Sequence, residues 1–299
     1  MATSIAAPVE LVGVTKAFGE RIAVADVSFA LAAGAVTGFL GPNGAGKSTS
    51  LRMIGGLLRP SAGRVTLFGR DARRPAARAC LGYMPADPTF VLNLTGHQNL
   101  DLLAKLRGSD SPERATVAAA LDLPERDLDL PVRAFSSGMR QKLAIIAALQ
   151  HRPELVVLDE PANRLDPLAH HAFCAVIAGV ARSGRTVLLS SHVLTEVEEV
   201  CDTVILMRDG RLLQTSGVAE LQRQASREVT LTYSAPPRRV LNALTAVQVD
   251  GSVVRGRIPA HRTDILRELL HGEPGLVDLT VVPVSLEELF RDLYVGGGP

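Results

Sequence analysis

One segment constrains the fold of this chain more than any other. It reads Gly41-Pro42-Asn43-Gly44-Ala45-Gly46-Lys47-Ser48-Thr49 and fits the pattern G-x-x-x-x-G-K-[ST]. An apolar run over residues 35–40 precedes it and predicts a short strand, while residues 47–58 predict a helix. A strand, a glycine loop and a helix in this order are typical of a P-loop. The segment therefore predicts an α/β fold with a parallel sheet.

The residue types of this loop suit a chain of phosphates. Glycines let successive backbone N–H groups converge on phosphate oxygens at the positive end of a helix. Lys47 can reach the β- and γ-phosphates, and the Ser48 hydroxyl can bind Mg²⁺. We therefore predict that residues 41–49 bind a nucleotide and that Ser48 is a metal ligand. A plain glycine-rich turn is the alternative, which the flanking strand and helix disfavour. A P-loop alone leaves kinases, GTPases, helicases and transport ATPases open.

An acidic pair follows a second apolar run. Residues 155–158 read as a buried parallel strand, and Asp159 and Glu160 come directly after it. Ligands of α/β sheets bind at the carboxyl ends of the strands. We predict that Asp159 holds Mg²⁺ through water and that Glu160 orients or deprotonates an attacking water. The alternative is a solvated acidic pair at the end of a strand.

The pattern of predicted elements divides the chain into two domains. Up to residue 222, a β-hairpin over residues 11–31, a helical stretch over residues 94–150 and alternating strands and helices predict a mixed sheet with a helical subdomain. From 223 to 299 the order β-α-β-β-α-β predicts a small ferredoxin-like α+β module, which we interpret as regulatory or accessory. Its last helix is predicted to begin at Ser285.

Composition limits the partners of this chain. The net charge is +1, aromatic residues make up 4% and Trp is absent, which argues against a nucleic acid partner. Three scattered cysteines without a CxxC pair favour a reduced, cytosolic protein. No stretch predicts a signal peptide or a transmembrane helix, so we expect any membrane role to come through a partner.

The segment Phe135-Ser136-Ser137-Gly138-Met139-Arg140-Gln141 lies between the P-loop and the acidic pair. It resembles the signature motif of the ATP-binding cassette (ABC) family, whose usual form is L-S-G-G-Q, with Ser137 in place of the middle glycine. The resemblance implies that Ser136, Ser137 and Gly138 contact the γ-phosphate held by an opposite subunit. It also implies a P-loop ABC ATPase fold that binds ATP and Mg²⁺.

Further matches follow the order of the family. Phe18 is similar to the aromatic residue that stacks on adenine, and Val24 is assigned to the same nucleotide-binding set. Leu165-Asp166-Pro167 looks like the D-loop, in which Asp166 touches the opposite site. His192 matches the switch histidine that contacts the γ-phosphate. The resemblance implies that Glu160, His192 and Lys47 are catalytic. Taken singly, these residues could be a core aromatic, a turn residue and an ordinary histidine.

One position departs from the family pattern. The Q-loop glutamine, whose amide oxygen contacts Mg²⁺ or its water, is replaced by Ala86, and Asp87 follows. Either the contact is lost or Asp87 makes it one residue later, so Asp87 is a further candidate metal ligand. The alternative is that Asp87, placed before Pro88, starts a turn.

The end of the chain carries a second resemblance. Ser285-Leu286-Glu287-Glu288-Leu289-Phe290 is similar to the S-L-E-x-x-F ending of drug- and antibiotic-export ATPase subunits that pair with ABC-2-type permeases. It implies an ATP-hydrolysing subunit that drives efflux of a drug, antibiotic or lipid-like molecule. Its partners would be membrane permease subunits and a second ATPase subunit, expected to be identical, at the cytoplasmic face of the cell membrane. The alternative is a soluble ABC ATPase that acts on ribosomes or DNA.

Overall fold

The computed structural model describes residues 6–224, 226–235, 244–259, 262, 265 and 275–284. The chain divides into two compact units, Met1–Ser216 and Gly217–Pro299, each described here by itself. The division lies a few residues before the boundary that the sequence predicts at 222. Among the helices of the described residues, none combines the length and the apolar composition needed to cross a membrane.

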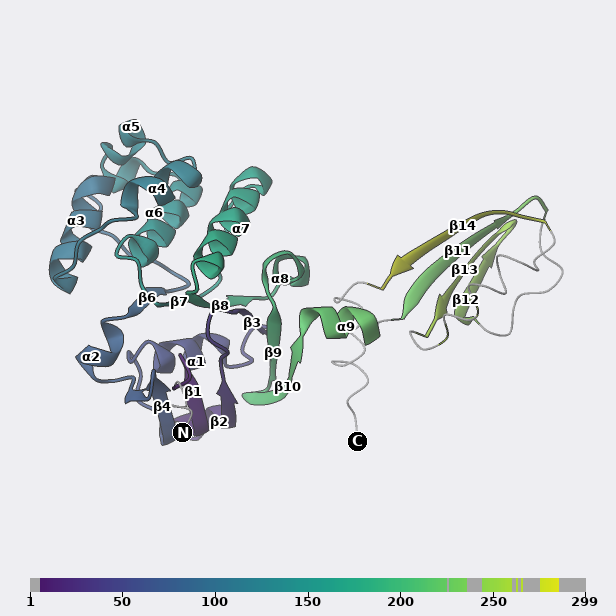
Figure 1. Cartoon of the computed structure of the whole chain (residues 1–299), viewed down its shortest axis with the longest axis horizontal. Coiled ribbons are helices and arrows are strands. Elements are labelled where there is room, and N and C mark those ends of the chain that lie inside the picture. The colour runs from purple at the N-terminus through teal and green to yellow at the C-terminus, as the bar shows by residue number, and fades with distance from the viewer. Residues whose placement is uncertain are drawn as a thin grey trace. The chain divides into compact units, whose positions relative to one another are not determined.

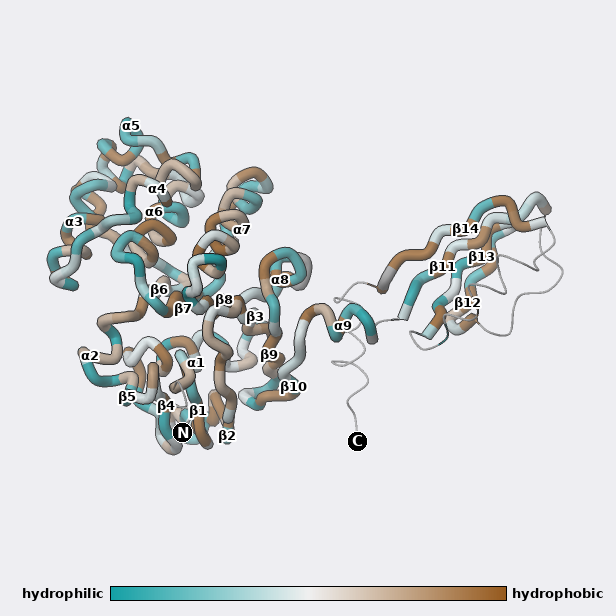
Figure 2. Tube along the Cα trace, viewed as in Figure 1, coloured by the Kyte–Doolittle hydropathy of each residue, from teal (hydrophilic) through white to brown (hydrophobic). Residues whose placement is uncertain are grey.

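A largely parallel sheet forms the centre of the first unit (Figure 1). Its strand order is β10-β9-β3-β8-β7-β6, and β3 pairs in parallel with β8 and β9, as β7 does with β6 and β8. Every residue of β3, β7 and β8 is buried, and the apolar character of β9 is visible in Figure 2. The strands are β3 (Val36–Leu40), β6 (Leu81–Met84), β7 (Leu155–Leu158), β8 (Thr186–Ser191), β9 (Thr203–Arg208) and β10 (Arg211–Gly217). Because β8 lies between β3 and β7, the loops that follow these three strands meet at one edge.

An antiparallel sheet covers one side of this unit. Its order is β2-β1-β4-β5, and the predicted N-terminal hairpin is formed by its first two strands. Gly19, with φ of 59°, makes the turn between them. The strands are β1 (Glu10–Phe18), β2 (Arg21–Ala30), β4 (Ala62–Leu67) and β5 (Arg70–Asp71). The mixed architecture that the sequence predicts is confirmed.

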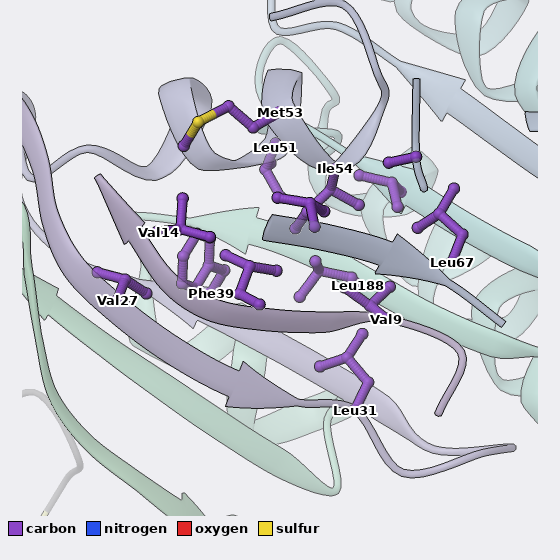
Figure 3. Close-up of a cluster of buried hydrophobic side chains, with 14 of the residues drawn as sticks. Val9, Val14, Val27, Leu31, Phe39, Leu51, Met53, Ile54, Leu67 and Leu188 are labelled. Carbon is purple, nitrogen blue, oxygen red and sulfur yellow. The ribbon is translucent and has the colours of Figure 1, made fainter. Parts of the chain in front are cut away.

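A hydrophobic core joins the two sheets through helix α1 (Lys47–Ile54), as Figure 3 shows. Phe39, Leu51 and Leu188 come from β3, α1 and β8, and they are fully or almost fully buried. The removal of each such side chain from water contributes about 1.5–3 kcal/mol to the stability of the fold. The sequence predicted α1 as far as residue 58, but the helix ends at Ile54 because Gly55 and Gly56 follow it. Gly56 has φ of 66°, the left-handed conformation typical of helix ends.

The remaining helices of the first unit fall into two groups. One group packs together as the predicted helical subdomain (Figure 1) and consists of α3 (Gly96–Arg107), α4 (Arg114–Ala120), α5 (Glu125–Leu128) and α6 (Ser137–Leu149). The other elements lead into strands of the central sheet and are α2 (Pro75–Arg78), α7 (Pro167–Arg182) and α8 (Leu194–Val200). A 3₁₀ turn, Val132–Ala134, precedes α6.

The second unit contains a four-stranded antiparallel sheet of order β12-β13-β11-β14. This is the strand order of a ferredoxin-like module, with the first strand paired to the third and fourth. The elements are α9 (Val218–Gln224), β11 (Arg227–Tyr233), β12 (Thr245–Asp250), β13 (Val253–Ile258) and β14 (Leu276–Pro283). Val229, Leu231 and Val254 are fully buried in its core. The helices predicted over residues 237–244 and 263–271 lie almost entirely outside the described residues, and the helix predicted from Ser285 lies wholly outside them.

Candidate nucleotide-binding site

The loop between β3 and α1 has the conformation that its glycines permit. Gly41 has φ of 158°, and a Cβ there would lie 2.4 Å from the Met207 carbonyl oxygen. Gly46 has φ of 100°, and a Cβ there would lie 2.6 Å from the Ala23 carbonyl oxygen. Both positions therefore exclude larger residues by contact with neighbouring backbone as well as by backbone strain. The predicted P-loop is present between the predicted strand and helix.

Lys47 begins α1 and its side chain turns back over the loop. Its Nζ donates to the Gly41 carbonyl at 2.5 Å and to the Pro42 carbonyl at 3.5 Å. The same ammonium lies 3.6 Å from Glu160 Oε1, and the Lys47 side chain is only 6% exposed. A cation held this way beside converging backbone N–H groups is positioned to bind anionic phosphate oxygens.

Asp159 forms the centre of a buried hydrogen-bond network at the end of β7. Its Oδ1 accepts from Ser48 Oγ at 3.1 Å and from Ser190 Oγ at 2.7 Å. Its Oδ2 is buried and has no hydrogen-bond partner among the described residues. Burial raises the pKa of Asp159, while the hydrogen bonds from Ser190 and Ser48 oppose that rise. A hydroxyl and a carboxylate with a free oxygen fit the oxygen ligands that Mg²⁺ prefers.

This unpaired carboxylate oxygen leads to a prediction about stability. Asp159→Asn is expected to raise the unfolding temperature of the nucleotide-free protein at neutral pH, because it removes a buried charge and keeps an oxygen that can accept from Ser48 and Ser190. A gain of about 1 kcal/mol would correspond to roughly 2–4 °C in a domain of this size. The measurement is thermal unfolding without nucleotide. Asp202→Asn is the contrasting variant, because the Asp202 carboxylate accepts a hydrogen bond from the Val36 N–H.

The raised pKa of Asp159 makes the stability of the protein depend on pH. This pKa lies above the ordinary value of 3.8, so between 3.8 and the native pKa the native state binds more protons than the unfolded state. Stability therefore falls as the pH rises through this interval, and the penalty is complete above the native pKa. The difference between wild type and the Asn variant should be largest at neutral pH and should narrow as the pH falls toward 3.8. An equal difference at all pH values would contradict this account.

Glu160 is held from several sides. It has φ of 52°, a strained conformation for a residue other than glycine, and its N–H donates to Ser190 Oγ at 2.8 Å. The carboxylate lies between two cationic or polar groups, with Oε1 3.6 Å from Lys47 Nζ and Oε2 2.8 Å from His192 Nδ1. His192 follows β8, and its side chain is 45% exposed. The structure thus brings together all three residues that the resemblance assigns to catalysis.

Two supporting residues, Gln141 and Ser190, were not predicted as site residues. The buried Gln141 of α6 donates through Nε2 to the carbonyls of Glu160 at 3.1 Å and Pro161 at 2.8 Å, which fixes the backbone after β7. Ser190 links Asp159 and Glu160 from the neighbouring strand. The sequence held one sign of the role of Gln141. This polar residue directly precedes the apolar run 143–149 of Leu, Ala and Ile, and a buried polar side chain needs a hydrogen-bond partner.

A pocket of about 360 Å³ opens over the loop. It is lined by Pro42, Asn43, Gly44, Ala45, Gly46, Lys47, Ser48, Thr49, Glu160 and His192, together with Arg21, Ala23, Ala86 and Asn163. The last four were not predicted as site residues. Val24 does not line this pocket, because its side chain is fully buried beneath the loop near Gly46 and leaves Ala23 at the surface. Phe18 is 52% exposed and lies under the Lys16 ammonium, 5.0 Å from the centre of its ring.

The signature residues and Asp166 lie elsewhere on the first unit. Ser136 and Ser137 are exposed, and Ser136 Oγ accepts from the Met139 N–H at 3.1 Å as the N-cap of α6. Asp166 is the N-cap of α7 and accepts from the Ala169 N–H at 2.8 Å. None of these residues, nor Gly138, lines the pocket of their own chain. A contact between them and a nucleotide would therefore require a second subunit.

Asp87 does not belong to the hydrogen-bond network around Asp159. Its carboxylate is 85% exposed and pairs with Arg164 at 3.1 Å, whereas its neighbour Ala86 lines the pocket. Arg164 has φ of 70° and belongs to the turn before Asp166. The arrangement favours loss of the Q-loop contact over a contact made by Asp87.

A parallel sheet with a P-loop, an antiparallel sheet beside it and a helical subdomain define a nucleotide-binding domain of the ATP-binding cassette class. Residues 24–163 match the model of the ABC transporter family. The chain is 36% identical to a bacitracin transport ATP-binding protein of Enterococcus faecalis over 97% of both chains. It is 32% identical to a Nod factor export ATP-binding protein of Mesorhizobium japonicum, over 95% of this chain and 86% of that one.

Solved structures of ABC transporter ATP-binding subunits are also similar to this chain. An ATP-binding subunit of an ABC transporter superposes with a TM-score of 0.67 at 30% identity, over 72% of this chain and 92% of that chain. A dimeric ATP-binding cassette in a post-hydrolysis state with ADP and Pi gives a TM-score of 0.65 at 25% identity, over 70% of this chain and 98% of that one. The chain belongs to the family of ABC transporter ATP-binding proteins. It is an ATPase subunit, as its motifs predicted.

Proposed function

We propose that this chain hydrolyses ATP to drive export of a drug, antibiotic or lipid-like molecule through a separate membrane permease. The observation that carries the proposal is the position of Glu160 between Lys47 and His192 in the pocket over the P-loop. The relatives named for bacitracin transport and Nod factor export support the export class, since they are similar over nearly the whole chain.

We assign a step to five residues in or beside the pocket, on the basis of their positions. Lys47 binds the β- and γ-phosphates from the loop side. Ser48 and Asp159 would hold Mg²⁺, which when bound neutralises charge on the phosphates. Glu160 accepts a proton from the attacking water. His192 holds the Glu160 carboxylate in place and faces the same pocket, where it can also donate to the γ-phosphate.

The exposed motifs suit a dimer on a membrane partner. Ser136, Ser137, Gly138 and Asp166 are available to complete the site of a second, identical subunit, because none of them lines the pocket of its own chain. The pair would lie on ABC-2-type permease subunits at the cytoplasmic face of the membrane. No described residue of the second unit lines the ATP pocket, and we assign this unit a regulatory or dimer-stabilising role.

Co-purification tests the export assignment against action on ribosomes or DNA. The Glu160→Gln variant with ATP and Mg²⁺ should retain a polytopic membrane protein from detergent-solubilised membranes of the source cell. Lys47→Ala provides the matched control, since it should not form the ATP-bound dimer. Recovery of ribosomes or DNA in place of a membrane protein, in an ATP-dependent manner, would overturn the proposal.

The position of Asp87 gives a further prediction. Asp87→Ala is expected to change the Mg²⁺ concentration for half-maximal ATP hydrolysis by less than about threefold, because an exposed ion pair with Arg164 contributes little. Ala86→Gln, which adds an amide to the pocket wall, is expected to lower that concentration. A tenfold or greater Mg²⁺ shift in Asp87→Ala, about 1.4 kcal/mol, would show that this carboxylate reaches the metal after all.

A further inference from the structure

One cluster away from the ATP pocket combines three side chains that bind transition metals. His170 and Cys174 belong to α7, and Glu199 belongs to α8. One ligand atom from each side chain lies within 4.8 Å of the other two. The two helices contact each other, as Figure 1 shows.

The distances within this cluster are close to those around a tetrahedral ion. Cys174 Sγ lies 3.9 Å from His170 Nδ1 and 3.6 Å from Glu199 Oε2, and the last two atoms are 3.7 Å apart. Zinc bonds of about 2.3 Å to sulfur and about 2.0–2.2 Å to nitrogen and oxygen place tetrahedral ligands roughly 3.4–3.6 Å apart. Each separation therefore needs a change of only a few tenths of an ångström.

The backbone positions these ligands independently of any ion. His170 and Cys174 are four residues apart and so lie on one face of α7. Helix α8 is anchored by Val197, which is fully buried against Gly38 of β3. Glu199 is thereby brought toward α7 by core packing, so the cluster does not depend on its own weak hydrogen bonds.

The cluster is also open enough for an ion to enter. The His170 side chain is 18% exposed and that of Glu199 is 46% exposed. The exposed side of the cluster leaves room for a water molecule as the fourth ligand. Zinc accepts such an arrangement of three protein ligands and one water. A thiol and an imidazole are poor ligands for Mg²⁺ and Ca²⁺, which prefer oxygen.

A reactive thiol is the competing interpretation, and the surroundings of Cys174 oppose it. Burial and the Glu199 carboxylate raise the pKa of this thiol to about 12, so it remains protonated and a weak nucleophile at neutral pH. The thiol donates to Glu199 at 3.6 Å. A bound ion would take the place of this proton, which passes to water as the metal–sulfur bond forms.

We propose that His170, Cys174 and Glu199 form a Zn²⁺ site that joins α7 to α8. Helix α7 begins directly after Asp166, and α8 begins shortly after His192. An ion shared by the two helices would tie the segment at Asp166, which we propose faces a second subunit, to the segment at His192, which contacts Glu160. The site uses no residue of the ATP pocket, so its existence does not depend on the function proposed above.

Cobalt titration of the full, metal-free chain tests the site directly. Co²⁺ should produce a near-ultraviolet charge-transfer band, which requires a bond between cobalt and a thiolate, together with intense visible bands of tetrahedral geometry. Saturation at one ion per chain and displacement by Zn²⁺ are expected. Zn²⁺ should also raise the unfolding temperature of the nucleotide-free protein.

Matched variants identify the ligands. Cys174→Ala should abolish the charge-transfer band, and His170→Asn and Glu199→Gln should each weaken Co²⁺ binding by at least about tenfold. Cys80→Ser and His171→Asn, a cysteine elsewhere and the exposed neighbour of His170, should bind like wild type. If Cys174→Ala does not fold, the other two ligand variants decide the question. Absence of the band in wild type, its persistence in Cys174→Ala, or unchanged Co²⁺ affinity in both other variants would overturn the proposal.

Discussion

Glu160→Gln is expected to lower steady-state ATP hydrolysis by at least about a hundredfold while nucleotide affinity stays near the wild-type value. Glutamine keeps the shape of the side chain between Lys47 and His192, but its amide cannot accept a proton from water. The variant should therefore hold ATP and accumulate as a closed dimer. Phosphate release measures the turnover, calorimetry with Mg²⁺ and ATP measures affinity, and size-exclusion chromatography measures dimerisation.

Glu154→Gln provides the matched control for this experiment. Glu154 is exposed and precedes β7, whereas Glu160 follows the other end of the same strand. The control should hydrolyse ATP at the wild-type rate. Wild-type turnover in Glu160→Gln would show that the base lies elsewhere. Loss of ATP binding in that variant would mean that the carboxylate contributes to the structure of the pocket.

Local sequence patterns were sufficient for the residues of the ATP pocket that follow strands. The loop after β3, the acidic pair after β7 and His192 after β8 all lie at the carboxyl ends of neighbouring strands, so the parallel order of the sheet alone brings them together. The ferredoxin-like strand order was predictable for a related reason. The Asp250-Gly251 turn specifies that β12 and β13 are adjacent, and the predicted order β-α-β-β-α-β is that of a ferredoxin-like module.

Contacts between distant segments were not predictable in this way. Gln141 is far from Glu160 in sequence, and its hydrogen bonds depend on how α6 packs beside β7. Asp87 was a candidate metal ligand because the local sequence does not reveal its ion pair with Arg164, which lies 77 residues away. Val24 was assigned to the nucleotide-binding set, but successive side chains of β2 point to opposite faces, so Val24 is buried and its neighbour Ala23 lines the pocket.

Lys47→Ala is expected to weaken ATP binding by at least about a hundredfold, which corresponds to about 2.8 kcal/mol. The Lys47 ammonium is the cation of the P-loop, is 6% exposed, and is held by the Gly41 carbonyl beside Glu160. Its removal takes away a charge-assisted contact to the phosphates. It also leaves the Glu160 carboxylate facing the same pocket without its neighbouring cation, so repulsion adds to the loss. Calorimetry with Mg²⁺ and ATP measures this effect.

Lys105→Ala, at an exposed position of α3 outside the pocket, is the control that should bind ATP like wild type. A double variant separates the two parts of the loss. If repulsion from the carboxylate contributes, Lys47→Ala combined with Glu160→Gln should bind ATP more tightly than Lys47→Ala alone, and the difference measures the coupling across the 3.6 Å pair. Equal ATP affinity in wild type and Lys47→Ala would refute the assignment of this loop to phosphate binding, because no other Lys lines the pocket within the described residues.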